Sequence, residues 1–495
     1  MRKCPERRNS PEQSDSLGDF RFTGRRKRGI IQLFCLILYK ASEEGTAMKK
    51  LTFRQLLAVA SMLFGLFFGA GNLIFPASMG QLAGRSIWSA AAGFLITGVG
   101  LPLLGVVALG VSQEDGLLGL SSRVGKWYGL FFTCALYLTI GPFFAIPRCA
   151  TVSYTVGVQR MLPGTGQNMG LALFSLLFFA AVLVLSLRPG QILTWVGKVL
   201  NPLFLCFLAV LLLRALTAPL GDPAQFMPEG AYASGAFSTG LLEGYNTMDA
   251  LAGLAFGIIV VNVIRGLGVR DPGAVAQNTV RAGLLSSLLM ALIYVLVTVA
   301  GAQSRGAFGV SENGGEVLAQ MAEHYFGPAG AVILAVTVTV ACLKTAVGLI
   351  TSCGETFVAL FPKGPSYQVW AVAFCVLSFL IANLGLDAIL AYSLPVLMFL
   401  YPLAIVLILL TLGGRAFQND RSILRWTLAF TAAAALFDFL RTLPEGARTV
   451  LHLESVITWV IRWLPLAGRG FGWICPALVG LAVGLLMRRL RSAHC

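Results

Sequence analysis

The sequence predicts an all-α polytopic membrane protein with about 12 transmembrane helices. Of its 495 residues, 57% are apolar and only 12% are charged, and the mean hydropathy is +0.79. Soluble domains carry roughly 25% charged residues, so a water-soluble protein is excluded. Runs of about twenty predominantly apolar residues recur along the chain, each long enough to cross about 30 Å of hydrocarbon as a helix. These runs are continuously apolar rather than alternating, which excludes a membrane β-barrel.

Residues 1–47 differ from the rest of the chain because they are basic and polar apart from one apolar stretch at 30–39, which is too short to span a bilayer. The stretch resembles the core of a signal peptide, but an acidic segment follows it and an Ala-x-Ala cleavage site is missing. We interpret residues 1–47 as a disordered extension or a mis-assigned start, because MKKLTFRQLL at Met48 looks like a natural beginning. Residues 48–495 are then a single membrane domain.

Twelve spans are predicted from Met48 onward. They lie at 54–80, 87–111, 127–150, 168–187, 191–216, 236–262, 279–301, 328–352, 368–386, 388–411, 424–440 and 472–488. The first five (within 48–216) and the next five (within 236–411) form two halves, and the last two lie within 424–488. Asp438 and Arg441 shorten the eleventh span. The short loops on the side of the amino terminus carry more Lys and Arg, which predicts that both termini are cytoplasmic.

The net charge of +15 belongs to the extension and to the ends of the spans, so it indicates orientation and not nucleic-acid binding. The ten cysteines stand singly and none of the three histidines lies within a long apolar span, so a metal cluster in the membrane is not expected. The segment SENGGEVLAQMAEHYFG predicts a short helix over the outer face, capped by Ser311 and closed by Gly327.

The first span contains Gly69, Gly71, Asn72 and Pro76 in the middle of an apolar run. Glycine tolerates irregular backbone and proline lacks an amide donor, so we expect a helix broken near GAGN. Broken backbone at membrane depth is stable only where it lines a cavity or contacts protein. The alternative is a close helix contact made by small residues.

The sixth span carries Glu243, Asn246, Thr247 and Asp249 near the outer third of an apolar helix. Carboxylates within spans are costly, by at least about 2.5 kcal/mol at the bilayer centre, so they need partners or a wet cavity. Spans one and six hold matching positions in the two halves, and interrupted helices at matching positions indicate a transporter's midplane site. We therefore place a substrate site at this pair of spans.

Broken helices offer amide groups to an anion and carbonyl groups to a cation, which suits a zwitterionic amino acid. We expect the substrate carboxylate to bind the first break, formed by Gly69, Ala70, Gly71 and Asn72. We expect the ammonium to bind the second, formed by Tyr245, Asn246, Thr247 and Asp249. An apolar wall for an aliphatic side chain is provided by Phe64, Phe67 and Phe68, for which plain helix packing is the alternative.

In the third span, Pro142 and Pro147 predict a kink that releases carbonyl groups. The expected polar lining is Tyr137, Thr139 and Tyr154. We expect Arg148 at the outer interface, where it would set orientation.

The stretches FFGAGNLIFP, LTIGPFFAIPR and EGYNTMDALA closely resemble hallmark segments of the bacterial branched-chain amino acid carriers, the leucine/isoleucine/valine cation symporter family. The likeness runs from about Met48 to the last span. It implies uptake of leucine, isoleucine and valine with Na⁺ or H⁺ as coupling ion and no other cofactor, at the bacterial cytoplasmic membrane. It also implies the five-plus-five inverted repeat of the amino acid–polyamine–cation superfamily. Its partners are then branched-chain amino acids and the lipid bilayer, not nucleic acid.

The eighth span departs from the family pattern because Lys344 stands beside Thr345, where the resemblance implies a small residue. In related folds, hydroxyls on this helix complete a sodium site with carbonyls of the broken first helix, which implies Na⁺ at Gly69, Thr345 and Ser352. One hypothesis places the Lys344 ammonium at the ion position, so that coupling is to protons or absent. The other pairs Lys344 with a carboxylate or turns it into a wet vestibule, and leaves Na⁺ to the hydroxyls.

Three other functions remain as alternatives. An exchanger or uniporter would equilibrate substrate without ion coupling. A membrane-embedded enzyme is disfavoured because no span offers a nucleophile, base and orienting group together. A channel or a leucine sensor would differ from a carrier in saturation or in the absence of transport.

Overall fold

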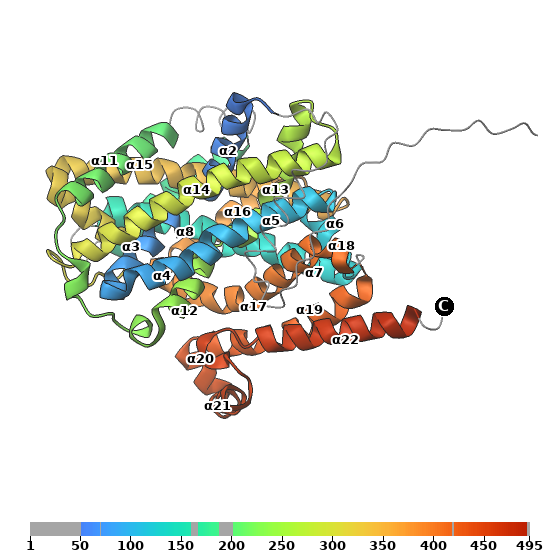
Figure 1. Ribbon diagram of the computed structural model, residues 1–495. Helices are drawn as coiled ribbons and strands as arrows, with labels where there is room; N and C mark the ends of the chain where they lie inside the picture. Colours follow the sequence, from blue (N-terminus) through green and yellow to red (C-terminus); the bar gives the residue numbers. More distant parts are fainter. Residues whose placement is uncertain (1–50, 70, 160–166, 188–200, 418–419, 493–495) are drawn as a thin grey trace, which may run out of the picture. The chain divides into compact units, whose positions relative to one another are not determined.

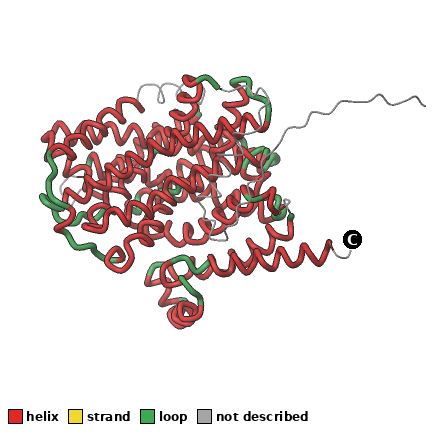
Figure 2. Tube along the Cα trace, viewed as in Figure 1, coloured by secondary structure: helices red, strands yellow, loops and turns green. Residues whose placement is uncertain are grey.

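The computed structural model describes residues 51–69, 71–159, 167–187, 201–417 and 420–492. Within these ranges the chain forms helices joined by loops and turns, with no strand (Figure 2). Residues 49–495 form one compact unit, and the interpretation of residues 1–47 lies outside the described residues. The all-α fold class is confirmed.

The first half contains spans one to five (Figure 1). Its helices are α2 (Phe53–Phe67), α3 (Gly71–Ala83), α4 (Ile87–Leu95), α5 (Leu101–Ser112), α6 (Leu117–Ser122), α7 (Lys126–Leu138), α8 (Ala145–Gly157), α9 (Gln167–Ser186) and α11 (Asn201–Thr217). A π-helical segment, Ile96–Gly100, joins α4 to α5, and a second, Thr139–Phe143, joins α7 to α8. Gly141 in the second is not helical, which confirms the predicted kink beside Pro142.

The second half and the last two spans follow. Their main helices are α12 (Ala231–Asn246), α13 (Asp249–Gly266), α14 (Pro272–Ser304), α15 (Gly314–Leu360), α16 (Tyr367–Ala382), α17 (Leu386–Leu412), α19 (Arg421–Thr442) and α22 (Ile474–Ser492), with α20 (Glu445–Val450) and α21 (Glu454–Trp463) between the last two. Eight described helical stretches are long and apolar enough to cross a membrane, and three shorter apolar helices add to them. The eleventh span is longer than predicted, because α19 continues through Asp438 and Arg441.

Capping residues set several helix starts. Thr52 and Gln55 form a capping box at α2, and Asp271 accepts the amide of Ala274 at the start of α14. The predicted cap at Ser311 is wrong: Asn313 caps α15 by accepting the amides of Gly315 and Glu316.

Gly327, with φ 64°, ends the short first part of α15 as predicted, and the helix resumes at Pro328. Serine and asparagine stabilise a helix start about equally well as N-cap residues. The sequence therefore does not distinguish Ser311 from Asn313 as the cap.

The two halves pack in the same pattern. For each of the following contacts between two spans, the spans that occupy the same positions in the opposite halves are also in contact. α3 packs on α14, and correspondingly α13 packs on α5. α2 packs on α14 as α12 packs on α4, and α16 packs on α8 as α15 packs on α9. Because five spans precede the sixth, the second half enters the membrane from the opposite side. The two halves are therefore an inverted repeat.

Glycines bring two helix pairs into backbone contact. Each glycine stands against a backbone carbonyl that a Cβ atom would strike: Gly80 against Thr298 and Gly301 against Ala77 between α3 and α14, and Gly93 against Phe237 and Gly240 against Ala90 between α4 and α12. Small residues at membrane helix contacts allow this close approach.

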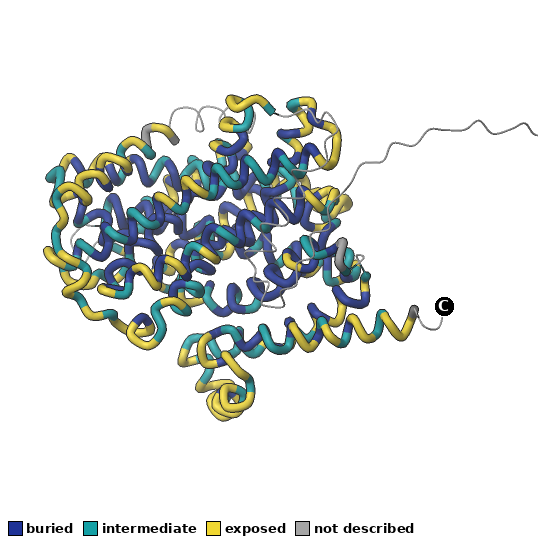
Figure 3. The backbone as a smooth tube through the Cα atoms, viewed as in Figure 1, coloured by how far each residue is buried: buried dark blue, intermediate teal, exposed yellow. Residues whose placement is uncertain are grey.

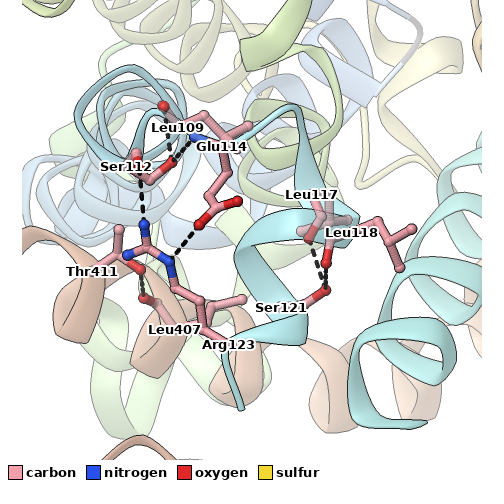
Figure 4. A network of polar contacts seen from close by, with 9 residues as sticks. All are labelled: Leu109, Ser112, Glu114, Leu117, Leu118, Ser121, Arg123, Leu407 and Thr411. Carbon is pink, nitrogen blue, oxygen red and sulfur yellow. Dashed lines mark hydrogen bonds and ion pairs between the residues drawn. The ribbon is translucent and has the colours of Figure 1, made fainter. Parts of the chain in front are cut away.

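A polar network holds the turn after α5 (Figure 4). Arg123 forms an ion pair with Glu114 (Nε–Oε1 2.9 Å) and donates from Nη2 to the carbonyl of Ser112 (2.8 Å). These bonds satisfy a carbonyl at the end of α5, which helix geometry leaves without an intrahelical partner.

Burial is greatest on the helices near the middle of the bundle. Buried residues are concentrated on α3, α5, α8, α13 and α17, whereas α21 is largely exposed (Figure 3). Trp459 and Trp463 on α21 have 65% and 69% of their surface exposed. Helix α22 packs along α19, which in turn packs on α17.

Candidate functional site

The first span is broken, as predicted. α2 ends at Phe67, Phe68 is extended (φ −71°, ψ 103°), and α3 begins at Gly71. The amide of Gly69 donates to Oδ1 of Asn72 (2.8 Å), which stabilises the unwound segment. Ala70, predicted to bind substrate, lies outside the described residues.

The two glycines of this break face side chains and not a neighbouring helix backbone. A Cβ atom at Gly69 would lie 3.2 Å from Cγ2 of Thr345, and one at Gly71 would lie 2.7 Å from Nη2 of Arg148. Both glycines line a cavity, which favours a helix broken at a cavity over the alternative of small-residue helix packing.

The sixth span is broken at the matching place. α12 ends at Asn246, Met248 adopts a left-handed conformation (φ 63°), and α13 begins at Asp249. The Thr247 hydroxyl donates to the carbonyl of Gly244 (2.9 Å) and accepts the amide of Asp249 (3.3 Å). These side-chain bonds replace backbone bonds that the break removes.

A buried network joins the two breaks. Nδ2 of Asn72 donates to Oδ2 of Asp249 (2.6 Å), and the Tyr294 hydroxyl donates to the same oxygen (2.8 Å). Asn72 also donates to the hydroxyl of Tyr294. All three side chains are buried. Asp249 thus has the partners that a carboxylate in a span requires.

A cavity with a volume of about 40 Å³ lies between the two breaks. It is lined by Leu66, Phe67, Gly69, Gly71, Asn72, Ile140, Ala145, Arg148, Cys149, Thr247, Met248, Asp249, Ala252, Phe256, Thr345 and Leu349. One water molecule needs a cavity volume of roughly 10–15 Å³, so this cavity accommodates a few water-sized groups. Its lining combines one basic side chain, one acidic side chain and several apolar ones.

Arg148 corrects our expectation of an interfacial residue. Its side chain is 3% exposed and lines the cavity. Nη1 donates to the carbonyl of Asn246 (2.6 Å), and the guanidinium lies over the Phe75 ring, 5.1 Å from its centroid. The expectation failed because the third span was predicted to end near residue 150, whereas α8 continues to Gly157 and keeps Arg148 inside the helix.

Only some of the predicted substrate residues reach the cavity. Phe67 lines it, whereas Phe68 stacks on Phe64 with ring centroids 4.8 Å apart. Tyr245 is outside the lining and stacks on Tyr401 at 4.1 Å. Asn246 contributes its backbone carbonyl, which Arg148 occupies.

The predicted polar residues of the third span are likewise outside the cavity lining, and the Tyr137 hydroxyl instead donates to the carbonyl of Ala255 on α13 (3.2 Å).

On α15, Thr345 lines the cavity beside Gly69, while Lys344 does not. Ser352 follows Thr345 by seven residues on a continuous helix, which separates them by about 10 Å along the axis. One ion of Na⁺ size cannot bind both hydroxyls. The structure therefore brings two of the three predicted sodium ligands together.

Sequence reasoning missed the apolar part of the wall and Tyr294. The apolar lining side chains that it missed are Leu66, Ile140, Ala145, Cys149, Met248, Ala252, Phe256 and Leu349. Nothing in the pattern distinguishes these from side chains that face lipid. Tyr294 had a weak signal, a lone tyrosine within a long apolar span.

Sequence comparison matches residues 52–491 to the model of a family described as "Branched-chain amino acid transport protein". A branched-chain amino acid permease BrnQ of Lactobacillus delbrueckii subsp. lactis is 52% identical over 436 residues, which cover 88% of this chain and 97% of the relative. BrnQ of Bacillus subtilis is 41% identical over 444 residues, covering 90% and 99%. A branched-chain amino acid transport system 2 carrier protein of Pseudomonas aeruginosa is 42% identical over 438 residues, covering 88% and 96%.

The fold is similar to that of Mhp1, a nucleobase-cation-symport-1 family transporter solved in a closed conformation with bromovinylhydantoin bound. The TM-score is 0.55 at 15% identity, covering 88% of this chain and 92% of Mhp1. An inward-facing conformation of Mhp1 matches with the same TM-score at 14% identity, covering 90% of this chain and 96% of Mhp1.

Proposed function

Because the chain belongs to the branched-chain amino acid transport protein family, we propose that it imports leucine, isoleucine and valine with a coupling cation. The observation that carries this proposal is the cavity between the two broken helices, which places Arg148 and Asp249 in one apolar-walled space. Amino acids with aliphatic side chains have this combination of charges and apolar surface. The relatives are named permeases and carriers, so the chain is a transporter and not an enzyme.

The substrate ammonium binds near Asp249, and the carboxylate binds the amino end of α3 at Gly71 and Asn72. The first amides of a helix lack intrahelical acceptors and carry the positive end of its dipole. Asp249 already accepts bonds from Asn72 and Tyr294, which hold its carboxylate in place for the ammonium. The aliphatic side chain packs against the apolar part of the wall, where Phe67 and Phe256 provide aromatic surface.

Sodium is the coupling ion that the geometry favours. Gly69 belongs to the unwound segment, and a Cβ atom there would lie 3.4 Å from Oγ1 of Thr345, so backbone of the break and a hydroxyl lie close together. Unwound carbonyls coordinate Na⁺ in transporters of broken-helix type. Lys344 is beside this place but outside the cavity lining, and proton coupling through Lys344 is the competing outcome.

Transport proceeds by alternating access. A branched-chain amino acid is larger than the few water-sized groups that the cavity accommodates, so the wall must move for the substrate to enter. Movement of one group of helices against another around a fixed site provides that change. One positive charge moving inward across 100 mV releases about 2.3 kcal/mol, which sustains roughly fifty-fold accumulation of a neutral substrate.

The protein is placed in the bacterial cytoplasmic membrane with both termini inside. Support comes from the bacterial relatives and from the excess of Lys and Arg in the loops assigned to that side.

The test is uptake of radiolabelled leucine into proteoliposomes at fixed membrane potential, with an inward Na⁺ gradient compared with an inward H⁺ gradient. We expect accumulation with Na⁺, and its loss in Thr345→Ala but not in Ser352→Ala. Accumulation driven by H⁺ alone, and abolished by Lys344→Met, would replace sodium with protons. Equilibration without accumulation under either gradient would indicate a uniporter, and uptake only against internal leucine an exchanger.

A further inference from the structure

Arg148 is a buried cation, and no carboxylate of the described residues lies within ion-pair distance of its guanidinium. None of the ion pairs among the described residues includes it, and its side chain is 3% exposed. Its two described hydrogen bonds go to backbone carbonyls, at 2.6 Å to Asn246 and 3.5 Å to Thr247, and Nε has no hydrogen-bond partner in the described part of the chain. A guanidinium has five N–H donors in a planar fork, so donors remain for a ligand.

The position of the guanidinium brings a second positive group to the place where an anion is expected. Nη2 lies 2.7 Å from where a Cβ of Gly71 would stand, so it is next to the amino end of α3. The charge of Arg148 and the dipole of α3 therefore meet at one point of the cavity wall. Asp249 lines the same cavity but forms no ion pair with Arg148 among the described residues.

We propose that Arg148 binds the carboxylate of the amino acid substrate, together with the amino end of α3. This inference rests on the proposed function and adds the residue that selects for the carboxylate. Arginine suits the role because its fork matches both carboxylate oxygens. The site then contains one fixed cation and one fixed anion, which complements the two charges of a zwitterion.

The inference also explains the carbonyl contacts of Arg148. The guanidinium binds the carbonyl end of α12, which carries the negative end of that helix's dipole. The same carbonyls are then not available to the substrate ammonium, which is left to Asp249. Binding of the carboxylate gives the guanidinium a charged partner on the side that faces the cavity.

The experiment compares leucine with leucinamide, which retains the ammonium and side chain but lacks the carboxylate. Binding of both to the purified full-length protein in detergent is measured for the wild type, Arg148→Gln and Arg148→Lys. We expect the wild type to prefer leucine by roughly 10- to 150-fold, the range of a charge-assisted hydrogen-bonded contact. Arg148→Gln should reduce this ratio to near one, because it weakens leucine binding and removes the repulsion of leucinamide. Arg148→Lys should give an intermediate ratio.

Arg305→Gln is the matched control. Arg305 also donates to a backbone carbonyl (Gln81, 3.0 Å) and lies over an aromatic ring (Phe226, 5.2 Å), but it pairs with Glu229 and does not line the cavity. We expect the wild-type ratio in this variant. A purely structural role of Arg148 would weaken both ligands equally.

A wild-type ratio in Arg148→Gln and Arg148→Lys overturns the inference while leaving the transporter intact. If Arg148→Gln does not fold, the ratio in Arg148→Lys decides. A wild-type protein that binds no branched-chain amino acid overturns the proposed function itself, and with it the inference.

Discussion

The hydroxyl of Tyr294 is the part of the buried network that can be removed with the smallest change of shape. It donates to Asp249 at 2.8 Å and accepts a hydrogen bond from Asn72, and its ring packs edge-on against Phe94 at 5.1 Å. Tyr294→Phe deletes the hydroxyl and keeps the ring. Asp249 retains the bond from Asn72 but loses a hydrogen bond to a buried charge.

A hydrogen bond to a charged group contributes about 1.5–3 kcal/mol, so we expect Tyr294→Phe to reduce the free energy of unfolding by about 2 kcal/mol. The matched control is Tyr128→Phe. Its hydroxyl is buried with no hydrogen-bond partner in the described chain, and its ring stacks on Phe132 at 5.6 Å. Removing an unsatisfied hydroxyl should leave stability unchanged or slightly raised.

Both variants are to be compared with the wild type by denaturant unfolding in one detergent, followed by intrinsic fluorescence. Equal effects of the two substitutions would refute the reasoning, because they would show that the network does not stabilise the fold beyond what a tyrosine hydroxyl does elsewhere. A larger loss in Tyr294→Phe that disappears in an Asp249→Asn background would show that the carboxylate is the partner that matters.

Three further predictions concern the cavity. Asp249→Asn should weaken leucine binding about tenfold or more, since it removes the fixed anion; unchanged affinity and accumulation would exclude Asp249 from the site. Phe67→Leu should change the preference among leucine, isoleucine and valine in competition assays, whereas Phe68→Leu should not, because of these two rings Phe67 alone lines the cavity. The same substrate preference in both variants would assign both rings to packing. Gly71→Ala should weaken leucine uptake, since its Cβ would lie 2.7 Å from Nη2 of Arg148 and would displace the guanidinium. Gly266→Ala, with nothing within 4 Å, should transport normally.

The two breaks could be predicted because they depend on local chemistry. Gly69 and Gly71 permit irregular backbone, and a carboxylate such as Asp249 inside an apolar span demands partners. Pairing the two breaks required only the count of spans. These signals are present in the sequence irrespective of how the helices pack.

The rest of the site depends on where a helix ends and which way it faces. Arg148 was misplaced because the third span was taken to end seven residues too early, and a positive charge at a span end reads as an orientation signal. Ile140 and Leu349 have the same sequence pattern whether they face lipid or a cavity. Ser352 shares a helix face with Thr345, but seven residues of helix put two turns between them, so a shared face does not make a shared ion site.

The glycines that face backbone carbonyls have a mechanical consequence. Gly80 and Gly301 lie on opposite partners of the α3–α14 pair, so each helix is seated against the other at two levels, and Gly93 and Gly240 do the same for α4 and α12. Helices packed in this way should resist sliding, because an axial shift moves each carbonyl from a glycine toward a residue that carries a Cβ atom. Each pair should then move as a rigid body during the transport cycle. Bending is expected at the unwound segments around Gly69 and Met248.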